Sequence, residues 1–311
     1  MRSSAIDILK IILAILIVLL HTNIFHLESK YINFTLINGF FRIAVPIFLI
    51  ITGYYFHRIS SLFEIKTWCK RLGLLYIVWM TIYAPIWFKF IDNIPKLLTI
   101  LFLGHHHLWY IIGTLYACII LYILRKKNTS FLITFATISY LISYVTQLLT
   151  IYYPEKIFLA DQFYHLYMYR NFISICLPFL IIGYLIKRYD LGSKLKKINY
   201  FVPLAFLILF SESYYLYKIP TATSIDLLLS LPFASTVIFL SFIKLDFRLN
   251  TSQISNLSTG IYVVHIYVIL IFEKYNIINN NSILRSLLIL FFSIILALII
   301  LKVSQRYKFL L

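Results

Sequence analysis

The sequence is poor in charge, and above all in negative charge. Only 13% of its 311 residues are charged, and 11 acidic residues face 28 lysines and arginines, for a formal net charge of +17. With 61% hydrophobic residues, this composition excludes a soluble globular domain. The basic residues lie in short clusters between apolar segments and form no single basic face, so we expect no nucleic-acid partner.

Cysteine is also scarce, and the common catalytic signatures are missing. Cys69, Cys118 and Cys176 are scattered along the chain and indicate neither a disulfide framework nor a metal site. The sequence contains no Walker loop, no GxGxxG motif, no GxSxG elbow and no HExxH spacing. It therefore gives no support to nucleotide hydrolysis or to a soluble-type serine hydrolase, and we expect no metal cofactor.

Long apolar runs are what the sequence has in abundance. Runs of about twenty residues between polar breaks predict ten membrane-spanning helices. The predicted spans cover residues 5–25, 38–57, 72–91, 107–124, 129–151, 171–187, 199–216, 223–243, 255–273 and 283–303. We therefore expect an all-α, polytopic integral membrane protein with a single transmembrane domain over residues 1–311.

The distribution of lysine and arginine predicts the orientation of these spans. If the N-terminus is cytoplasmic, 18 basic residues lie in inner loops and tails, 6 lie in outer loops, and 4 lie within spans. Because cytoplasmic loops carry an excess of lysine and arginine, this ratio predicts that both termini are cytoplasmic. We expect a multi-pass protein of the plasma (inner) membrane, in contact with its lipids.

The first predicted span carries three ionisable residues, Asp7, Lys10 and His21. At 100° per residue, the step from Lys10 to His21 ends within roughly 20° of a whole number of turns, so both side chains share one helix face about 16 Å apart. Ionisable residues inside a span indicate a functional site. The alternative is anchoring, in which Asp7 pairs with Lys10 at one interface and His21 marks the other.

Further polar residues fall in the outer halves of the predicted spans. They are Arg42, the cluster at 105–107, Arg170, Glu212 and His265. Each would cost a few kcal/mol against lipid, so we expect them to line a shared polar cavity. Simpler explanations stay open: the two arginines snorkel to the interface, and Glu212 caps the end of its helix. His265, one turn from Tyr262, is alternatively a packing histidine.

The segment between residues 96 and 125 is too long for one span. We expect a short helix over residues 96–103 that dips in from the outer face, a turn at Gly104, and a span that begins near Trp109. Histidine is a common zinc ligand, but three consecutive histidines cannot all reach one ion from a regular helix. The predicted outer loop at 152–170 either caps a cavity or forms an aromatic interface.

Four motifs, in the same order along the chain, resemble those of acyltransferase family 3 of membrane proteins. Lys10, ten further residues and His21 resemble the Arg-x10-His signature of the family's first helix, with lysine in place of arginine. Arg42-Ile-Ala-Val-Pro-Ile-Phe and the residues after it are similar to the family's second helix. His107-Leu-Trp109 resembles the His-Leu-Trp element, Tyr262-Val-Val-His265 resembles the late Tyr-x-x-His element, and Arg170-Asn171 also fits the pattern.

The resemblance implies an enzyme that transfers an acyl group, usually acetyl, from cytoplasmic acyl-CoA to a hydroxyl of an extracytoplasmic carbohydrate or lipid-linked glycan. His21 would be a general base or a transient acyl carrier. The predicted site has three parts: catalytic His21, Glu212 and His265; donor-binding Lys10, Arg42 and Arg170; and acceptor-binding His107, Trp109 and Tyr262. Lys10 keeps the charge of the family's arginine but loses its bidentate fork.

Two other functions remain open at this point. The same cavity would suit a transporter of a small polar solute, as suspected for relatives fused to amino-acid racemases, and prolines inside the predicted spans favour broken helices. These prolines are Pro46, Pro178, Pro203 and Pro232. The other function is that of a non-catalytic subunit in a polysaccharide synthesis complex.

Overall fold

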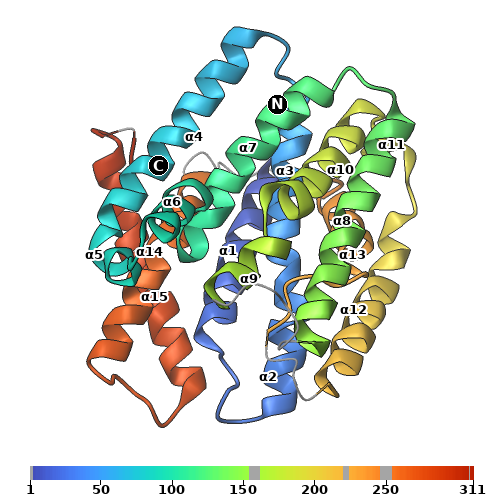
Figure 1. Ribbon diagram of the computed structural model, residues 1–311. Coiled ribbons are helices and arrows are strands. Elements are labelled where there is room, and N and C mark those ends of the chain that lie inside the picture. The colour runs from blue at the N-terminus through green and yellow to red at the C-terminus, as the bar shows by residue number, and fades with distance from the viewer. Residues whose placement is uncertain (1–2, 154–161, 220–223, 246–253, 308) are drawn as a thin grey trace. The chain divides into compact units, whose positions relative to one another are not determined.

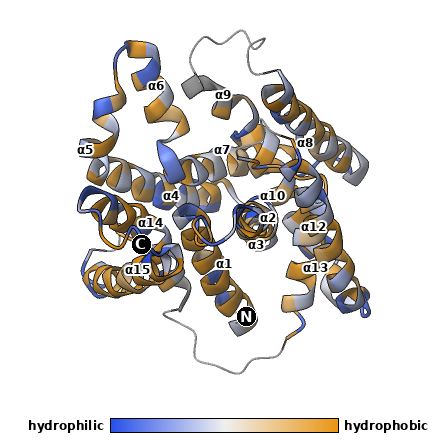
Figure 2. Ribbon diagram, turned by 90° about the horizontal axis from the view of Figure 1, so that it is seen from below, coloured by the Kyte–Doolittle hydropathy of each residue, from blue (hydrophilic) through white to orange (hydrophobic). Residues whose placement is uncertain are grey.

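The computed structural model describes residues 3–153, 162–219, 224–245, 254–307 and 309–311 (Figure 1). All regular elements within these residues are helices. In the described part of the chain, eight helices are long and apolar enough to cross a membrane, or up to nine if a bent pair counts as one span. Figure 2 shows hydrophobic residues prevailing along the long helices, as lipid contact requires. The expected all-α, polytopic membrane fold is confirmed.

Eight of the predicted spans correspond to these long helices. The long helices cover Ser4–Thr22, Lys30–Phe56, His106–Leu124, Thr129–Tyr152, Leu166–Arg188, Ile198–Tyr217, Asn256–Lys274 and Ser282–Ser304. The predicted spans at 72–91 and 223–243 correspond to a bent pair and to a shorter helix, respectively. Both differences have local causes in the sequence.

The bent pair consists of α4 (Leu62–Ile82) and α5 (Ala84–Trp87) with the short turn after it, and the two parts differ in direction by 55°. Helix α4 begins ten residues before the predicted start because Ser61 and Glu64 form a capping box. It ends where proline enters the first turn of α5, since proline cannot continue the hydrogen-bond ladder of a helix. The predicted span over 72–91 therefore begins ten residues too late and misses the bend, whereas its end agrees with that of the bent pair at Phe90.

The segment after the bent pair follows the sequence prediction closely. Helix α6 covers Ile94–Leu103, a single 3-10 turn covers His106–Leu108, and α7 covers Trp109–Leu124. Gly104 ends α6 with a φ of 83°, a backbone conformation that favours glycine. A Cβ atom at Gly104 would also come within 2.6 Å of the Trp109 backbone nitrogen. The turn therefore requires glycine both for its backbone conformation and for lack of space.

The predicted spans at 38–57 and 223–243 also contain segments that are not α-helical. The first is divided into α2 (Lys30–Ile37), a 3-10 turn (Phe40–Ile43) and α3 (Ala44–Phe56). The second contains α13 (Leu231–Phe242), which is preceded by a non-helical segment at 224–230. Proline in the first turn of α13 favours this late start.

Internal contacts divide the chain into two compact units. The first unit comprises residues 1–48 and 190–309, and the second comprises residues 49–189. In the first unit, α1 (Ser4–Thr22) packs against α14 (Ile254–Lys274) and α15 (Ser282–Ser304), which also pack against each other. Helix α12 (Val202–Tyr217) packs against α13 and α2.

The second unit contains α4 to α7, α8 (Thr129–Tyr152), α9 (Gln162–Tyr169), a π-helical turn (Phe172–Cys176) and α10 (Leu177–Arg188). Helix α10 approaches α3 very closely. A Cβ atom at Gly183 would lie 2.0 Å from the carbonyl oxygen of Ile50, and one at Gly53 would lie 2.0 Å from that of Leu180. Such contacts between small residues are typical of packed membrane helices, because backbones can then pack directly.

Candidate functional site

The structure brings together two of the predicted catalytic residues, His21 and His265. His21 lies in the last turn of α1, and His265 lies in the middle of α14. Their ring centroids are 5.2 Å apart, and His265 is completely buried. The apolar packing of α1 against α14 fixes this juxtaposition. Two imidazoles from helices far apart in sequence therefore form the centre of the candidate site.

A main-chain hydrogen bond orients the ring of His265. Its Nδ1 atom lies 2.7 Å from the carbonyl oxygen of Tyr262, one turn earlier in α14. A carbonyl oxygen only accepts, so Nδ1 must carry the hydrogen, and Nε2 is the acceptor nitrogen of the neutral ring. Tyr262, predicted to bind the acceptor, is itself buried and contributes here through its backbone. Its predicted role stays a prediction.

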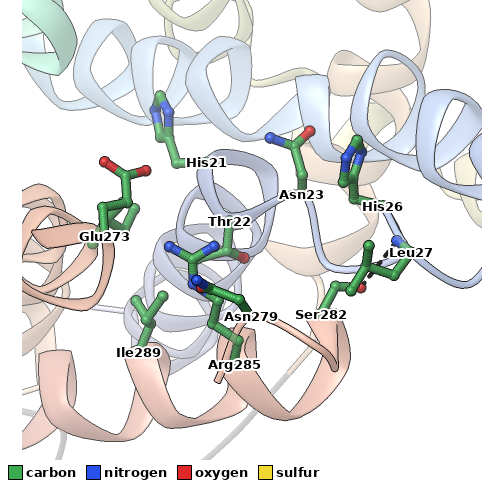
Figure 3. A pocket seen from close by; sticks show the side chains of 11 residues that line it. His21, Thr22, Asn23, His26, Leu27, Glu273, Asn279, Ser282, Arg285 and Ile289 are labelled. Carbon is green, nitrogen blue, oxygen red and sulfur yellow. Dashed lines mark hydrogen bonds between the residues drawn. The ribbon is translucent and has the colours of Figure 1, made fainter. Parts of the chain in front are cut away.

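A cavity of about 200 Å³ opens beside His21. Figure 3 shows its side chains converging from the end of α1, from the residues that follow it, and from α14 and α15. Polar residues that line it include Asn23, Glu273, Asn279, Ser282 and Arg285. Helix α1 ends at this cavity because Asn23 adopts the left-handed conformation, with a φ of 52°.

Sequence reasoning did not assign Glu273, Asn279, Ser282 or Arg285 to the site. One signal was present, because Arg285 is a cation inside the last predicted span. The other three lie at or beyond the ends of apolar runs, where polar residues are ordinary. Only the packing of α15 against α1 and α14 shows that they share a cavity with His21.

The loop after α1 is tied to the start of α15. Ser282 Oγ lies 2.7 Å from the carbonyl oxygen of Ile24 and hydrogen-bonds the carboxylate of Glu28. Hydrogen bonding from Ser282, with a smaller contribution from the backbone of Ile283, lowers the pKa of Glu28 and keeps this carboxylate ionised. An anion at a helix N-terminus is stabilising, so this contact holds the cavity wall in place.

Lys10 and Asp7 form an ion pair near the start of α1. Lys10 Nζ lies 3.7 Å from the Asp7 carboxylate, whose side chain is only 4% exposed, whereas that of Lys10 is 20% exposed. The pairing expected under the anchoring interpretation is thus present. It does not test the predicted donor role of Lys10, which stays a prediction.

Arg42 is held in a hydrogen-bonded network within the first unit. Its guanidinium pairs with the carboxylate of Asp226, and donates to Asn38 Oδ1 at 3.2 Å and to Ser224 Oγ at 3.1 Å. The side chains of Arg42 and Asp226 are only 12% and 8% exposed. Arg42 therefore does not snorkel. A donor phosphate would have to compete with Asp226, a residue that sequence reasoning missed.

Glu212 caps a helix, but not its own. Its carboxylate accepts hydrogen bonds from the backbone N–H groups of Leu229 and Ser230, at 2.7 and 2.9 Å, and from the Ser230 hydroxyl at 2.6 Å. These donors stand at the start of α13, so Glu212, on α12, fixes that helix end. The structure gives Glu212 a structural explanation, and its predicted catalytic role stays a prediction.

The remaining predicted residues belong to the second unit. His107 is 3% exposed, and its ring lies edge-on at 5.1 Å from that of Tyr83. The Arg170 guanidinium lies 5.7 Å from the centre of the Trp109 ring, a cation–π distance. Tyr167 donates a hydrogen bond of 2.9 Å to the carbonyl of Gly104. The candidate residues thus form two sets, one in each unit.

The histidine turn offers no evident metal site. In the part of the chain that the structure describes, no group of three or more histidine, cysteine, aspartate or glutamate side chains could hold a metal ion. The side chain of His165 lies outside the described residues.

Comparison with known proteins decides the family. The family model of the acyltransferase domain, acyltransferase family 3, matches residues 3–302. The chain belongs to this family. The match covers nearly the whole chain and runs through both units, which confirms the resemblance that the four motifs indicate.

A curated relative of this acyltransferase-family chain is an amino-acid racemase from Enterococcus faecalis. The two are 26% identical over 340 aligned residues, which cover 99% of this chain and 47% of the relative. The chain thus spans about half the length of the curated relative it matches. No solved structure matches the chain.

Proposed function

We propose that this chain is a membrane acyltransferase of the plasma membrane. It would move an acyl group, acetyl first among the candidates, from cytoplasmic acyl-CoA to a hydroxyl group of an extracytoplasmic carbohydrate or lipid-linked glycan. Membership of the acyltransferase family supports the reaction class. The observation that carries the proposal is His21, which lines a polar cavity and packs 5.2 Å from the buried His265.

In this proposal His21 is the general base. Its imidazole takes the proton of the acceptor hydroxyl as the oxygen attacks the thioester carbonyl, and the C–S bond breaks as the new ester bond forms. The proton held by His21 then passes to the departing thiolate of CoA, which leaves His21 neutral for the next cycle. His265 is a positioning residue, because its ring is locked by Tyr262 and limits how the His21 ring can turn.

Ester formation from a labelled donor tests this proposal directly. The purified protein in detergent is supplied with labelled acetyl-CoA and envelope glycans, and the glycans are analysed by mass spectrometry. We expect an acetyl ester that depends on the protein. In parallel, envelope glycans from cells with and without the gene should differ by one ester, and identical glycans together with no donor consumption would contradict the proposal.

Lys10 is proposed to attract the phosphates of acyl-CoA near the cytoplasmic face. The Lys10 side chain is 20% exposed beside Asp7, so an anion can approach its ammonium group. Both termini would then be cytoplasmic, as the charge distribution predicts.

Lys10→Ala is expected to raise KM for acetyl-CoA by about tenfold, because the donor loses one charge-assisted contact to the protein. Lys10→Arg should retain or lower KM, because arginine adds a bidentate fork. Initial rates against donor concentration measure both effects. Lys30→Ala, which removes an exposed lysine at the start of α2, is the control and should leave KM unchanged. An unchanged KM for Lys10→Ala would remove Lys10 from the donor site.

Transport of a small polar solute is the second candidate. Its support is the number of interrupted helices: the span Lys30–Phe56 is broken around Gly39, and a π-helical turn at Phe172–Cys176 precedes α10. Transporters use such breaks to form solute sites within the membrane. The racemase relative makes amino acids the first solutes to test. Uptake into proteoliposomes without donor consumption would favour this function over acyl transfer.

A further inference from the structure

We propose that the cavity beside His21 is the acceptor site, and that Arg285 selects acceptors that carry an anionic group, a carboxylate or a phosphate, next to the hydroxyl that is acylated. This inference rests on the proposed acyltransferase function and names its class of acceptor. It makes Arg285 a specificity-determining residue. Its support comes from the position of Arg285, its hydrogen bonding and the rest of the cavity lining.

The position of Arg285 is energetically unfavourable without a ligand. It is the fourth residue of α15, which begins at Ser282 and is one of the apolar helices long enough to cross a membrane. A cation near the N-terminus of a helix opposes the positive end of the helix dipole, and a cation in a membrane span is costly in itself. An anion bound at the cavity would offset both costs.

The hydrogen bonding of Arg285 is incomplete. Its Nε–H group is buried and has no hydrogen-bond partner among the described residues. Within those residues its guanidinium also forms no ion pair, in contrast to Arg42 with Asp226. A buried donor without an acceptor destabilises a protein, and the Arg285 side chain lines the cavity, so a ligand anion bound there would compensate the guanidinium.

The carboxylates near this cavity leave the guanidinium available. Glu28 is engaged by Ser282 at the start of α15. Glu273 lines the cavity from the end of α14 and is largely exposed. Figure 3 shows Glu273, His21 and Arg285 around the same space. Glu273 is thus placed to accept hydrogen bonds from ligand hydroxyls, which carboxylates do readily.

The remaining polar lining fits a polyhydroxylated ligand of small size. Thr22, Asn23, Asn279 and Ser282 supply hydroxyl and amide groups, which both donate and accept hydrogen bonds. The volume of about 200 Å³ is below the range of drug-sized sites, which begins at roughly 300 Å³. The cavity therefore fits about one sugar ring, with its acidic group at Arg285 and a hydroxyl at His21.

The test compares acceptors that share a glucose-type ring and differ in whether they carry an anionic group. The purified full chain in lipid nanodiscs receives acetyl-CoA with methyl glucoside, methyl glucuronide or glucose 1-phosphate, and ester formation is measured by mass spectrometry. The last two acceptors distinguish a carboxylate from a phosphate. We expect wild-type kcat/KM to favour at least one anionic acceptor by about tenfold or more over methyl glucoside, the value of a charge-assisted hydrogen-bonded pair.

Variants of Arg285 give the decisive comparison. Arg285→Gln should lose the preference, because it should raise KM for the anionic acceptor about tenfold more than KM for methyl glucoside, and Arg285→Lys should keep part of the preference. Lys274→Gln removes one positive charge from the exposed end of α14 at a residue that does not line the cavity, and should keep the full preference. A wild type without preference, or an Arg285→Gln variant that loses neutral and anionic substrates equally, would overturn the inference.

A binding measurement separates this inference from the proposed function. The shift in thermal unfolding midpoint caused by methyl glucuronide, glucose 1-phosphate or methyl glucoside needs no turnover. Stabilisation of the wild type, but not of Arg285→Gln, by an anionic sugar supports the anion site even if no acceptor is acylated. Equal shifts in both proteins would overturn it, and the unliganded midpoint of Arg285→Gln shows whether the variant is folded.

Discussion

His21→Ala is expected to lower acyl transfer by about 10²- to 10⁴-fold, the usual contribution of a general base. Without the imidazole, no group at this position takes the proton of the acceptor hydroxyl as it attacks the thioester. The loss should appear in kcat, because the donor phosphates and the acceptor's anionic group are bound by other residues in the proposed mechanism. Initial rates of labelled ester formation measure it.

His21→Ala should leave the fold intact. His21 is partly exposed and lines a cavity, so its truncation removes little buried contact, unlike truncation of the fully buried His265. The expected result is an unchanged thermal midpoint and unchanged elution in gel filtration.

His26→Ala is the matched control, since His26 lines the same cavity but is exposed. It should retain most of the activity. Full activity in His21→Ala, or an equal loss of activity in His21→Ala and His26→Ala, would contradict the assignment of His21 as the general base.

Much of the fold follows from the sequence, because the length and hydropathy of a helix are local properties. The eight long helices, the short helix α6 and the start of α7 at Trp109 were all predictable in this way. The errors arose where a proline, or a hydrogen-bond partner far away in the sequence, determines where a helix begins or bends. Helix α4 bends away where proline enters α5, and α13 starts late behind a segment whose Ile225 N–H bonds Asn38.

The candidate site was only half predictable, for a related reason. His21 and His265 carried a recognisable motif, and α1 and α14 do bring them together. A sequence does not show which charged side chains already have an ion-pair or hydrogen-bond partner in the fold. Arg42 and Glu212 were predicted as site residues but are bound by Asp226 and by the start of α13. Arg285, a cation inside the last predicted span, was assigned no role but lines the cavity.

Arg42→Ala is expected to lower the free energy of unfolding by about 3–5 kcal/mol, the cost of leaving one member of a buried ion pair uncompensated. Asp226 would remain as a carboxylate that is 8% exposed, without its main cation. Asp226→Asn should destabilise in the same direction, because Arg42 is then the uncompensated charge. Denaturation in detergent, followed by tryptophan fluorescence, measures both.

The double variant Arg42→Met with Asp226→Leu decides whether the pair is structural. It removes both charges at once, so it should recover much of the lost stability, as replacement of buried pairs by apolar residues does elsewhere. A more exposed pair is the control: Lys96 and Asp92 lie 3.0 Å apart, with side chains 14% and 62% exposed, and truncation of the exposed partner in Asp92→Ala should cost about 1 kcal/mol or less. If the double variant is stable and its KM for acetyl-CoA matches that of the wild type, Arg42 has a structural role, holding the non-helical segment before α13, and binds no donor phosphate. If stability recovers but KM for acetyl-CoA rises about tenfold, Arg42 contributes to donor binding despite its pairing with Asp226. A rise in KM without a loss of stability is explained only by a lost phosphate contact.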